Sequence, residues 1–418
     1  MLKKGVIAYG LLIAILSFVL VASSNMAVYS QSQHQWIVDK SGKADFTNIQ
    51  GAVNAANAGD FIFVNNGDYT EHIIINKENL KIYGYGAVVS GGFTIESDNV
   101  FLSGFTINGN SQSTGILLDN INACYVSNNT VSSSSIGILV NQSPPSTGSY
   151  AQNNIIGNKI LNNAYGIKFC YNFTSPPNKI YGNNIFDNVI SDNTHATYSE
   201  WNINSVEADG QNITFSQNKV SNNLFRNNEN TFEIYGNIDS LNTYNAVSLS
   251  FSDGIYNNNF LSTVKVSAKF NVNTWNLDDF GGKTITYGSV NVGTIPHLNT
   301  LGPWWGYVTD YWDNGTAGNY WSNYEGTDSN NDNIGDTAYT VSINTIDRYP
   351  LMAMASQESS PLVPDWAIPP SQTSTSNATP DYLLIIAIIT SVAVAASVSV
   401  LMLKRKQQLK LGRENRHE

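Results

Sequence analysis

Short apolar runs separated by polar turns dominate the middle of the chain. They occupy 61–64, 73–75, 80–83, 88–90, 93–95, 100–102 and 105–107. Runs of this length, bounded by Asn, Gly, Asp or Ser, are typical of β-strands, and they are too short for an ordinary meander of hairpins. A helical spacing of apolar residues precedes them at 46–57, where Asp45 or Thr47 is placed to cap a short helix.

The runs recur at intervals of about twenty residues. One phrase opens at Asn79, Asn99 and Asn122, and a second, which begins with Gly-Ile, opens at Gly115, Gly137 and Gly166. Such repeats are the signature of a solenoid in which each coil supplies three short strands and equivalent residues stack about 4.8 Å apart. The sequence therefore predicts an all-β parallel β-helix of roughly ten coils, with loops projecting where the spacing is irregular.

The composition fits this architecture. Asn accounts for 56 of the 418 residues and Gly for 32, whereas charged residues make up only 13%. Both Asn and Gly are poor helix formers that favour turns. At the corners of a β-helix, Asn side chains can stack into hydrogen-bonded ladders, and Asn tolerates left-handed backbone geometry. We therefore expect the asparagines mainly at coil corners between 79 and 260.

The coil ends need covers because exposed strand edges invite aggregation. The short helix at 46–57 is positioned to cover the first coil. We expect the repeats to occupy 31–300 and an aromatic and acidic C-terminal cap to occupy 301–355. The segment 356–381 is rich in Ser, Thr and Pro and is expected to form an extended stalk.

Both ends of the chain carry hydrophobic segments. Lys3 and Lys4 precede an apolar run within residues 1–30, which is typical of a secretory signal peptide, and an uncleaved anchor has the same pattern. Residues 382–403 form an uncharged run long enough for a transmembrane helix, and the basic tail 404–418 follows it. Because positive charge marks the cytoplasmic side, the region between the two segments is expected outside the cell membrane.

The expected ectodomain is more acidic than the whole chain. Residues 31–381 hold 13 Lys and Arg against 30 Asp and Glu, a formal charge of −17, whereas the whole chain carries −11. Such a surface repels nucleic acid and other polyanions. Cys124 and Cys170, the only cysteines, could form a disulfide or be buried thiols. Sequons for N-glycosylation stand at Asn128, Asn141, Asn172, Asn212, Asn314 and Asn377.

Two parts of the sequence resemble known families. The opening, from Val38-Asp-Lys-Ser-Gly to Asp60 and then Asn66-Gly-Asp-Tyr-Thr-Glu71, is similar to that of carbohydrate-acting β-helix proteins of the pectin-esterase-like and NosD-like kinds. The tail at 318–324, 328–336 and 347–351 resembles the C-terminal part of archaeal NosD-like surface proteins. The resemblance implies a right-handed parallel β-helix, of the pectin-lyase-like fold, exported to a cell surface. It implies no single activity.

An acidic loop in the predicted cap has the spacing of a calcium site. Oxygen side chains alternate with other residues, and a backbone carbonyl completes the set: Asp328, Asn330, Asp332, Ile334 and Asp336. Hard oxygen donors at this density suit Ca²⁺. Asn333 and Tyr339 stand where an EF-hand has its Gly and its bidentate Glu. We therefore predict a weak structural Ca²⁺ site, with a solvated acidic turn as the alternative.

Aromatic residues are concentrated in the same cap. They are Trp304, Trp305, Tyr307, Tyr311, Trp312, Tyr320, Trp321 and Tyr324. Flat aromatic faces beside polar groups can bind sugars, because sugar C–H faces stack on rings while hydroxyls form hydrogen bonds. The alternative is that these rings plug the end of the solenoid, which we favour. The ligand-binding candidates are Trp304, Trp305, Tyr311, Trp312, Tyr320 and Trp321.

Candidate catalytic residues gather on what reads as a long insert between repeats: Asp187, Asp192, His195, Glu200, Glu207 and Asp209. Paired carboxylates could serve as acid and base for glycoside hydrolysis. Lyases and esterases of the resembling fold use Arg or Lys to stabilise an anionic transition state. Only Arg226 and Arg348 are available in residues 31–381, so the sequence favours a binding protein over an enzyme. Arg226 joins the candidate catalytic set.

These patterns favour a membrane-anchored, cell-surface β-helix protein that binds an extracellular polysaccharide or envelope glycan, or that has a structural role in the envelope. The first alternative is a polysaccharide lyase or hydrolase on the same fold. A weaker one is a NosD-like copper-related protein, because His34, His72, His195 and His297 are scattered, whereas copper sites need clustered soft ligands. The expected partners are the membrane and a glycan, with no nucleic acid.

Overall fold

The structure, a computed structural model, describes thirteen stretches of the chain. They are 33–143, 152–173, 182–208, 212–216, 218–243, 248–251, 254–277, 283–285, 290–292, 305–308, 312–342, 345–356 and 363–368. The named helices and strands of these stretches lie in one compact unit, which ends at Ala367. The predicted signal peptide, transmembrane helix and cytoplasmic tail lie outside the described residues. Within those residues, no helix is long and apolar enough to cross a membrane.

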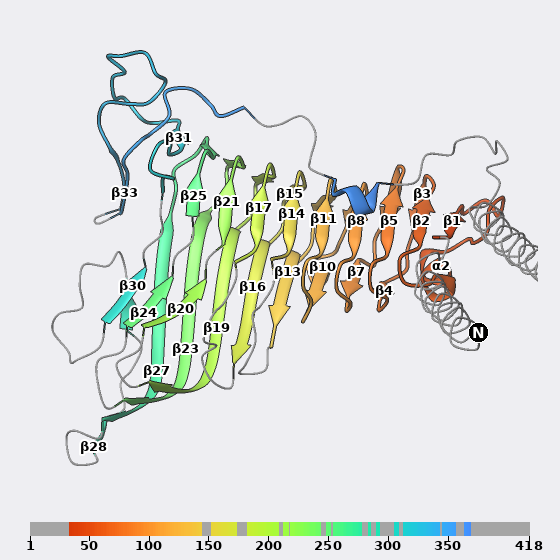
Figure 1. The fold of residues 1–418 in the computed structure, drawn as a ribbon, viewed down its shortest axis with the longest axis horizontal. Helices are drawn as coiled ribbons and strands as arrows, with labels where there is room; N and C mark the ends of the chain where they lie inside the picture. Colours follow the sequence, from red (N-terminus) through yellow and green to blue (C-terminus); the bar gives the residue numbers. More distant parts are fainter. Residues whose placement is uncertain are drawn as a thin grey trace, which may run out of the picture. The chain divides into compact units, whose positions relative to one another are not determined.

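Three parallel sheets, here called A, B and C, form the body of the unit (Figure 1). Sheet A contains β1 (Gln35–Val38), β2 (Phe61–Val64), β5 (Lys81–Gly84), β8 (Phe101–Ser103), β11 (Tyr125–Ser127), β14 (Asn154–Ile156), β17 (Asn184–Phe186), β21 (Lys219–Ser221) and β25 (Gly254–Tyr256). Sheet B contains β3 (Gly67–Tyr69), β6 (Ala87–Val89), β9 (Thr106–Asn108), β12 (Thr130–Ser132), β15 (Lys159–Leu161), β18 (Val189–Ser191), β22 (Leu224–Arg226), β26 (Asn259–Phe260) and β31 (Tyr320–Trp321).

Sheet C contains β4 (Ile73–Ile75), β7 (Phe93–Ile95), β10 (Thr114–Asp119), β13 (Ile136–Gln142), β16 (Tyr165–Phe173), β19 (His195–Ala208), β23 (Asn230–Thr243) and β27 (Val266–Leu277). Two short strands, β28 (Lys283–Ile285) and β29 (Val290–Val292), pair antiparallel with β27. A small parallel sheet joins β20 (Asn212–Ser216), β24 (Ser248–Phe251) and β30 (Trp305–Val308). β32 (Tyr339–Ser342) pairs antiparallel with β33 (Thr345–Asp347).

Each coil crosses sheets A, B and C in turn, and every pairing between successive coils is parallel. This confirms the predicted all-β parallel β-helix. The strands predicted at 61–64, 73–75 and 93–95 coincide with β2, β4 and β7. The interior is filled by stacked apolar residues, because alternate residues of a strand face inward and equivalent residues lie in register. In sheet B one such row runs Ile107, Val131, Ile160, Ile190, Phe225, Phe260 and Trp321.

Sheet C widens toward the C-terminal coils, and the other two sheets do not. Its strands lengthen from 3 residues in β4 to 14 in β19 and β23, as Figure 1 shows. The step between equivalent residues of sheet A grows from 20, between Phe61 and Lys81, to 35, between Lys219 and Gly254. Irregular repeat spacing was expected to come from projecting loops. That expectation is incomplete, because the segment interpreted as an insert contains β18 and β19, which belong to sheets B and C.

Asparagine ladders hold the corners together, as predicted. The longest joins Asn129, Asn158, Asn188, Asn223, Asn258 and Asn319, and each backbone N–H donates to the side-chain oxygen of the next asparagine at 2.9–3.0 Å. The amide nitrogens donate in both directions: that of Asn188 donates back to the Ile155 carbonyl at 2.8 Å and forward to the Asn223 side-chain oxygen at 3.0 Å. Two shorter ladders, Asn153–Asn183–Asn218 and Asn163–Asn193–Asn228, follow the other corners.

The residue before each of the first five rungs of the long ladder has left-handed backbone geometry. Its φ lies between 55° and 66° at Asn128, Gly157, Asp187, Asn222 and Asn257. Only residues without a bulky branched side chain adopt this geometry at low cost. The same requirement therefore selects Asn, Gly or Asp at this corner in successive coils.

A short helix covers the first coil. α2 (Ile49–Ala55) buries Ile49, Ala52 and Val53 against the coil. Its N-cap is Asn48, whose side chain accepts the Gly51 N–H, and Glu71 accepts the N–H groups of Ile49 and Gln50. The predicted helix is thus confirmed, but neither of the predicted capping residues, Asp45 and Thr47, is its N-cap.

The C-terminal end is plugged by aromatic rings. Trp321 stacks on Phe260 with ring centroids 4.7 Å apart, and Tyr339 covers Trp321 at 4.2 Å. Trp312 packs edge-on against Phe232 at 5.4 Å. Trp312 and Trp321 are almost completely buried. These rings therefore continue the apolar interior into the cap.

The long ladder ends on a buried carboxylate. Asp347, which is fully buried, accepts hydrogen bonds from the backbone N–H of Asn319 at 2.6 Å and from the indole N–H of Trp321 at 2.9 Å. Burial raises its pKa to about 6, although its hydrogen bonds with Trp321, Asn319 and Tyr349 act in the opposite direction. Nearby, Arg348 binds Asp313 at 2.6 Å. Burial opposes ionisation of Asp313 too, but its hydrogen bonds with Arg348 hold its pKa below the ordinary value.

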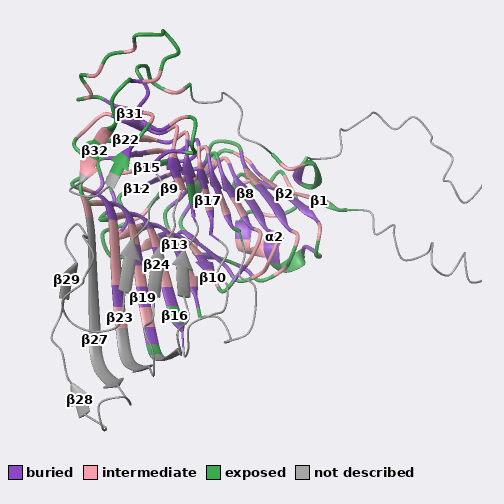
Figure 2. Ribbon diagram, turned by 60° about the vertical axis from the view of Figure 1, so that its left-hand side comes forward, coloured by how far each residue is buried: buried purple, intermediate pink, exposed green. Residues whose placement is uncertain are grey.

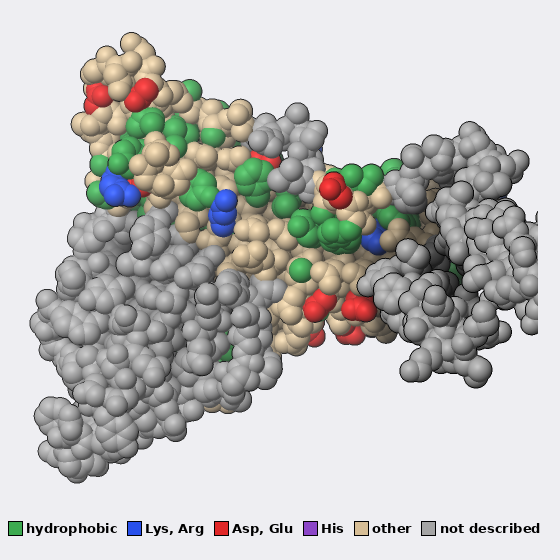
Figure 3. All heavy atoms as spheres, in the orientation of Figure 1, with side chains coloured by type: hydrophobic (Ala, Val, Ile, Leu, Met, Phe, Trp, Pro, Cys, Tyr) green, Lys and Arg blue, Asp and Glu red, His purple; other side chains and the backbone are tan. Residues whose placement is uncertain are grey.

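A strap formed by residues 363–367 docks on the outer face of sheet A. Its 3-10 turn, Asp365–Ala367, places Trp366 edge-on against Phe101 and Tyr125, with centroids 6.3 and 5.7 Å away. The Tyr83 hydroxyl donates to the Ala367 carbonyl. In Figure 3 hydrophobic side chains gather on the face where Figure 1 shows this turn, which is drawn in blue. This part of the predicted extended stalk is therefore a packed turn.

The chain that leads to the strap is also bound to a coil far from it. Ala355 exchanges two hydrogen bonds with Asn259 of β26, at 2.8 and 3.0 Å. Trp366, eleven residues later, contacts Tyr125 of β11 in sheet A. The sheet A strand that precedes β26 in the chain is β25, and it lies four strands along the sheet from β11. Four steps correspond to about 19 Å. In a solenoid each coil contacts only its neighbours, so this connection adds a long-range restraint.

We expect the stability of the cap to fall as pH rises from about 4 to about 6. Because the pKa of Asp347 is higher in the folded chain than its ordinary value of 3.8, the folded state holds this proton more tightly than the unfolded state. The stabilisation is complete below the ordinary pKa and is lost as pH passes the folded one. The loss amounts to about 3 kcal/mol.

The measurement is urea unfolding followed by tryptophan fluorescence across this pH range. Asp347→Asn cannot titrate, so subtracting its curve isolates the contribution of this carboxyl from those of other acids. If the wild-type and variant midpoints change in parallel with pH, the assignment to Asp347 is wrong.

Replacing Trp366 by Ala should release the strap and leave the coils folded. The variant loses two aromatic contacts, each worth about 0.5–1.5 kcal/mol. The Ala367 N–H, which donates to the Pro364 carbonyl at 2.8 Å, should exchange with deuterium faster by on the order of tenfold. Hydrogen exchange with mass spectrometry measures this. Trp366→Phe, which keeps a ring, is the matched control, and unchanged exchange in Trp366→Ala would contradict the packing.

Candidate functional site on the outer face of sheet C

The widest sheet carries a cluster of polar and aromatic side chains on its outer face. The cluster comes from three neighbouring strands, β16, β19 and β23, and comprises Tyr165, Lys168, His195, Tyr198, Glu200 and Glu233. Register places Lys168, Tyr198 and Glu233 in one row across the strands, and Tyr165 beside His195 in another. Figure 2 shows the three strands side by side, with buried and intermediate residues along them. We call these six residues the sheet C cluster.

The backbone of β19 passes close to Gly166 of β16, next to the cluster members Tyr165 and His195. A Cβ atom on Gly166 would lie 2.6 Å from the carbonyl oxygen of Ala196, so no other residue fits without a shift. Gly137 stands in the same relation to the Gly166 carbonyl. The Gly-Ile phrase of the sequence therefore marks the tight entry to each sheet C strand. Tyr165 and His195 lie just before this entry, in the intermediate burial class.

The aromatic members of the cluster pack into one group. The rings of Tyr165 and His195 are stacked, with centroids 4.5 Å apart and planes 12° apart. Tyr198 stands edge-on to Tyr165 at 5.1 Å and to His195 at 5.9 Å. The Lys168 ammonium lies over both tyrosine rings, at 5.2 and 5.3 Å from their centroids. Cation–π contacts of this kind hold the ring faces in place.

Two contacts between a basic and an acidic side chain complete the cluster. Lys168 binds Glu200 at 2.7 Å, and the His195 Nδ1 contacts the Glu233 carboxylate. Burial works against ionisation of Glu200, but its hydrogen bonds with Lys168 and Asn202 hold its pKa below the ordinary value. Burial and, next, the charge of Glu200 raise the pKa of Tyr198, which keeps its hydroxyl a hydrogen-bond donor. The side chains that make these two contacts are 19–25% exposed, so water and solutes reach them: Lys168, Glu200, His195 and Glu233.

A row of amides flanks the cluster on the same face. The Asn202 amide nitrogen donates to the Asn172 oxygen at 3.1 Å, and the Asn141 amide nitrogen donates to Asp119 at 2.7 Å. These side chains come from four successive coils. They therefore repeat hydrogen-bonding groups along the axis at about 4.8 Å.

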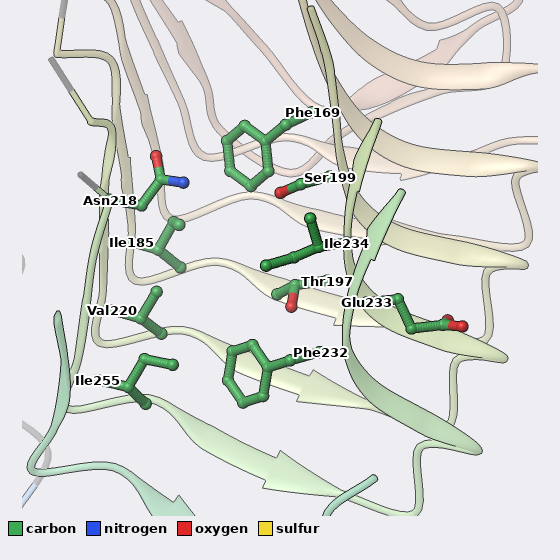
Figure 4. A pocket seen from close by; sticks show the side chains of 10 residues that line it. All are labelled: Phe169, Ile185, Thr197, Ser199, Asn218, Val220, Phe232, Glu233, Ile234 and Ile255. Atoms are coloured by element: carbon green, nitrogen blue, oxygen red, sulfur yellow. The ribbon is translucent and has the colours of Figure 1, made fainter. Parts of the chain in front are cut away.

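The inner face of the same strands lines a small cavity, with a volume of about 20 Å³ (Figure 4). Phe169, Thr197 and Phe232 point into it from sheet C, opposite Ile185 and Val220 of sheet A, whereas the carboxylate of Glu233 points away. This volume is about that of one water molecule. The cavity is therefore part of the packed interior, and a ligand can reach the strands only from outside.

The predicted catalytic residues do not come together as one group. His195 and Glu200 belong to the sheet C cluster. Asp187 and Asp192 instead occupy corner positions with left-handed backbone, at φ of 56° and 58°. Arg226 lies 4.0 Å from Asp192, away from the cluster on β22. The side chains of Glu207 and Asp209 lie outside the described residues.

Sequence reasoning missed Tyr165, Lys168, Tyr198 and Glu233. A signal was present, because equivalent outward positions carry Leu117 and Leu139 in earlier coils and then Lys168. A change from Leu to charged and aromatic residues at one rung of a repeat indicates a surface with a different role. Recognising it requires the strand register, which the variable repeat length conceals.

The predicted aromatic platform is corrected in part. Trp312 and Trp321 are buried in the cap, with 1% and 2% of their surface exposed, so their faces cannot stack on a sugar. Tyr320 is half-buried on β31. Trp304 and Tyr311 lie outside the described residues, and so does the side chain of Trp305. Plugging the solenoid, the favoured alternative, describes the two buried tryptophans.

The carboxylates of the acidic cap loop accept hydrogen bonds from backbone N–H groups and hydroxyls of the same loop. Asp328 accepts the N–H groups of Asp332 and Asn333, at 3.2 and 2.9 Å, and Asp332 accepts that of Ile334 at 2.9 Å. Asp336 accepts hydrogen bonds from the hydroxyls of Ser329 and Thr327, at 2.6 and 3.0 Å, which lower its pKa. Asn330 donates to Asp332. In the described part of the chain, no group of three or more His, Cys, Asp or Glu is arranged to hold a metal ion.

Among the described residues, the histidines and cysteines do not come together in a group that could hold a metal ion. His34 packs on Trp36, and His72 contacts the Gly91 carbonyl and the Thr94 hydroxyl. Cys124 and Cys170 are both free thiols, and burial raises the pKa of each. Copper needs several such ligands at one point, so the described residues do not fit a copper site.

The fold defines a parallel β-helix protein whose widest sheet presents a mixed aromatic and ionic surface. Residues 21–214 match the model of the NosD family, described as "Periplasmic copper-binding protein (NosD)". This match confirms the NosD-like resemblance for that part of the chain. A "Cell surface glycoprotein" of Methanothermus fervidus is 34% identical over 95 residues, which make up 21% of this chain and 16% of that protein. The chain therefore aligns with less than a fifth of this relative.

Among solved structures, a pectin methylesterase in complex with a hexasaccharide is 11% identical, with a TM-score of 0.28, covering 68% of this chain and 91% of its own. A rice weevil pectin methyl esterase is 11% identical with the same TM-score and covers 67% and 90%. ORF18 of Geobacillus virus E2 is 11% identical, with a TM-score of 0.25, covering 56% and 61%. At these scores the likenesses assign no role to any residue.

Proposed function

We propose that this chain is a cell-surface, right-handed β-helix protein that binds an extracellular glycan on the outer face of sheet C. The observation that carries the proposal is the sheet C cluster, where tyrosine and histidine rings stand beside ionised groups on three rigid strands. Aromatic rings take the C–H faces of sugars, and charged or amide groups take their hydroxyls. The cell-surface relative and the NosD-like resemblance support the location.

The surface suits an extended polymer better than a small molecule. The cluster lies on an open sheet face, and the adjacent amides repeat once per coil along the axis. A chain of sugars lying along the axis would meet equivalent groups several times. Weak contacts that repeat along one ligand add to a useful affinity.

The alternative is that the sheet C cluster catalyses glycoside hydrolysis. Glycoside hydrolysis needs one carboxyl that stays protonated and a second that is ionised. Lys168 keeps Glu200 ionised, which suits a base or nucleophile. Because the pKa of Glu200 is lowered, Glu200 does not supply the protonated carboxyl that such a reaction needs. We therefore place binding before catalysis.

Replacing Tyr198 by Ala should weaken glycan binding by about three- to tenfold, because a ring contact is worth about 0.5–1.5 kcal/mol. The purified full-length chain is first screened on an array of extracellular polysaccharides, and affinity for the retained polymer is then measured by calorimetry. Tyr85→Ala is the control, because Tyr85 is an exposed tyrosine on sheet A's side of the coil. Tyr198→Phe keeps the ring and should bind nearly as well.

Equal loss of affinity in Tyr85→Ala, or no retained polymer, would refute binding at this face. A reducing-sugar assay on the same polymers tests the alternative. Turnover abolished by Glu200→Gln or Glu233→Gln would assign the cluster to an enzyme instead.

We retain the structural Ca²⁺ of the cap loop as a separate proposal. Calorimetry with CaCl₂ should show one weak site, with a dissociation constant on the order of 10⁻⁴–10⁻³ M. Asp332→Ala should abolish it, and Asp313→Ala, which removes a cap carboxylate outside the loop, should not. Equal binding by Asp332→Ala would exclude the loop, because its central carboxylate would then have no part in the site.

A further inference from the structure

In four of the sequons the acceptor Asn and the central residue are described, and these sequons differ in how far the central residue is accessible. In three of them the central residue is buried: Asn129 between Asn128 and Thr130 at 1% exposure, Gln142 after Asn141 at 5%, and Phe173 after Asn172 at 3%. A transferase must hold the acceptor Asn and the hydroxyl residue two positions later in one active site. In each of these three sequons the central residue would have to leave its coil first.

The fourth sequon, Asn314-Gly315-Thr316, is presented differently. All three of its residues are exposed, in a turn of the C-terminal cap. Gly315 has a φ of 90°, and a Cβ atom at this position would meet no atom within 4 Å. The turn is therefore open on the side where an enzyme would approach.

The hydrogen bonds of this turn pair the acceptor with its hydroxyl residue. The Asn314 side-chain oxygen accepts the Thr316 hydroxyl at 2.8 Å, the Thr316 N–H at 3.0 Å and the Ala317 N–H at 2.9 Å. All three donors of the turn bind the Asn314 side-chain oxygen. The amide nitrogen, Nδ2, is on the other side of the amide group and points away from these donors. By contrast, the Asn141 nitrogen donates to Asp119 and the Asn172 nitrogen to Asn141.

We propose that Asn314 is an N-glycosylation site of this protein and the preferred one among these four. In the transfer, a bond forms between Asn314 Nδ2 and C1 of a sugar from a lipid-phosphate-linked oligosaccharide donor. The bond from that C1 to the donor phosphate oxygen breaks, Nδ2 loses one proton, and the lipid phosphate leaves with the electron pair. The proposal rests on the proposed extracellular location and is independent of glycan binding by sheet C.

A glycan at this position would stand on the cap, beyond the ring plug of Trp312 and Trp321. It would add a solvated group at the end of the coil stack. An exposed end is where two solenoids could otherwise pair edge to edge.

The test is glycopeptide mass spectrometry of the full chain secreted from a host that N-glycosylates its own proteins. We expect most Asn314 to carry a glycan and lower occupancy at Asn128, Asn141 and Asn172. Thr316→Ala should abolish modification of Asn314, whereas Thr316→Ser should retain it. Asn128→Gln is the matched control and should leave Asn314 occupancy unchanged.

Two results would overturn the proposal. One is an unmodified Asn314 peptide when another sequon of this chain, or a co-secreted reference glycoprotein, carries a glycan. The other is equal or higher occupancy at Asn128, which would show that accessibility of the folded tripeptide does not select the site. Neither result depends on the polysaccharide array, so failure here is distinguishable from failure of the proposed glycan binding.

Discussion

Hydrogen bonds between stacked asparagine side chains are the interaction on which the rest of this structure depends. At each corner the chain turns from one sheet to the next, and buried backbone groups there have no strand partner. Asn188 supplies both halves of the missing pairing, because its oxygen accepts the Asn158 N–H and its nitrogen donates to the Ile155 carbonyl. An unpaired buried group costs about 1–3 kcal/mol. Repeated at every rung, these bonds keep successive coils in register.

Fixed corners leave one sheet free to change. Sheets A and B keep strands of two to four residues, whereas sheet C reaches 14 residues in β19 and β23. Longer strands expose a wider outer face without disturbing the inner stack of apolar residues. The sheet C cluster lies on this widened part, and the strap covers β5, β8 and β11 on the outer face of sheet A. Part of one face is therefore covered by the chain itself, whereas the cluster on another face is partly exposed to solvent.

The C-terminal cap solves the problem of ending such a stack. Asn319 is the last asparagine of the ladder, and its backbone N–H donates to Asp347. Trp321 is the last residue of the apolar row. The Asp347 carboxylate also accepts the Trp321 indole N–H. Asp347 therefore contacts the last residue of the asparagine ladder and the last residue of the apolar row. The phrases around 318–324 and 347–351 resemble the C-terminal part of archaeal NosD-like surface proteins. Their physical role is this joint ending of the two rows.

The sequence by itself determined the class of fold, the corner asparagines and the first capping helix, because local pattern and turn chemistry are sufficient for these. Only the tertiary structure decided which residues meet. Asp187 and Asp192 are close in sequence to His195 but serve as corner residues, whereas Glu233, 38 residues from His195, contacts it. The strap is hidden from sequence for the same reason, since Trp366 and Phe101 are brought together by folding. In sheet A the step from one coil to the next varies from 20 to 35 residues, so neighbours across coils follow from register and not from sequence distance.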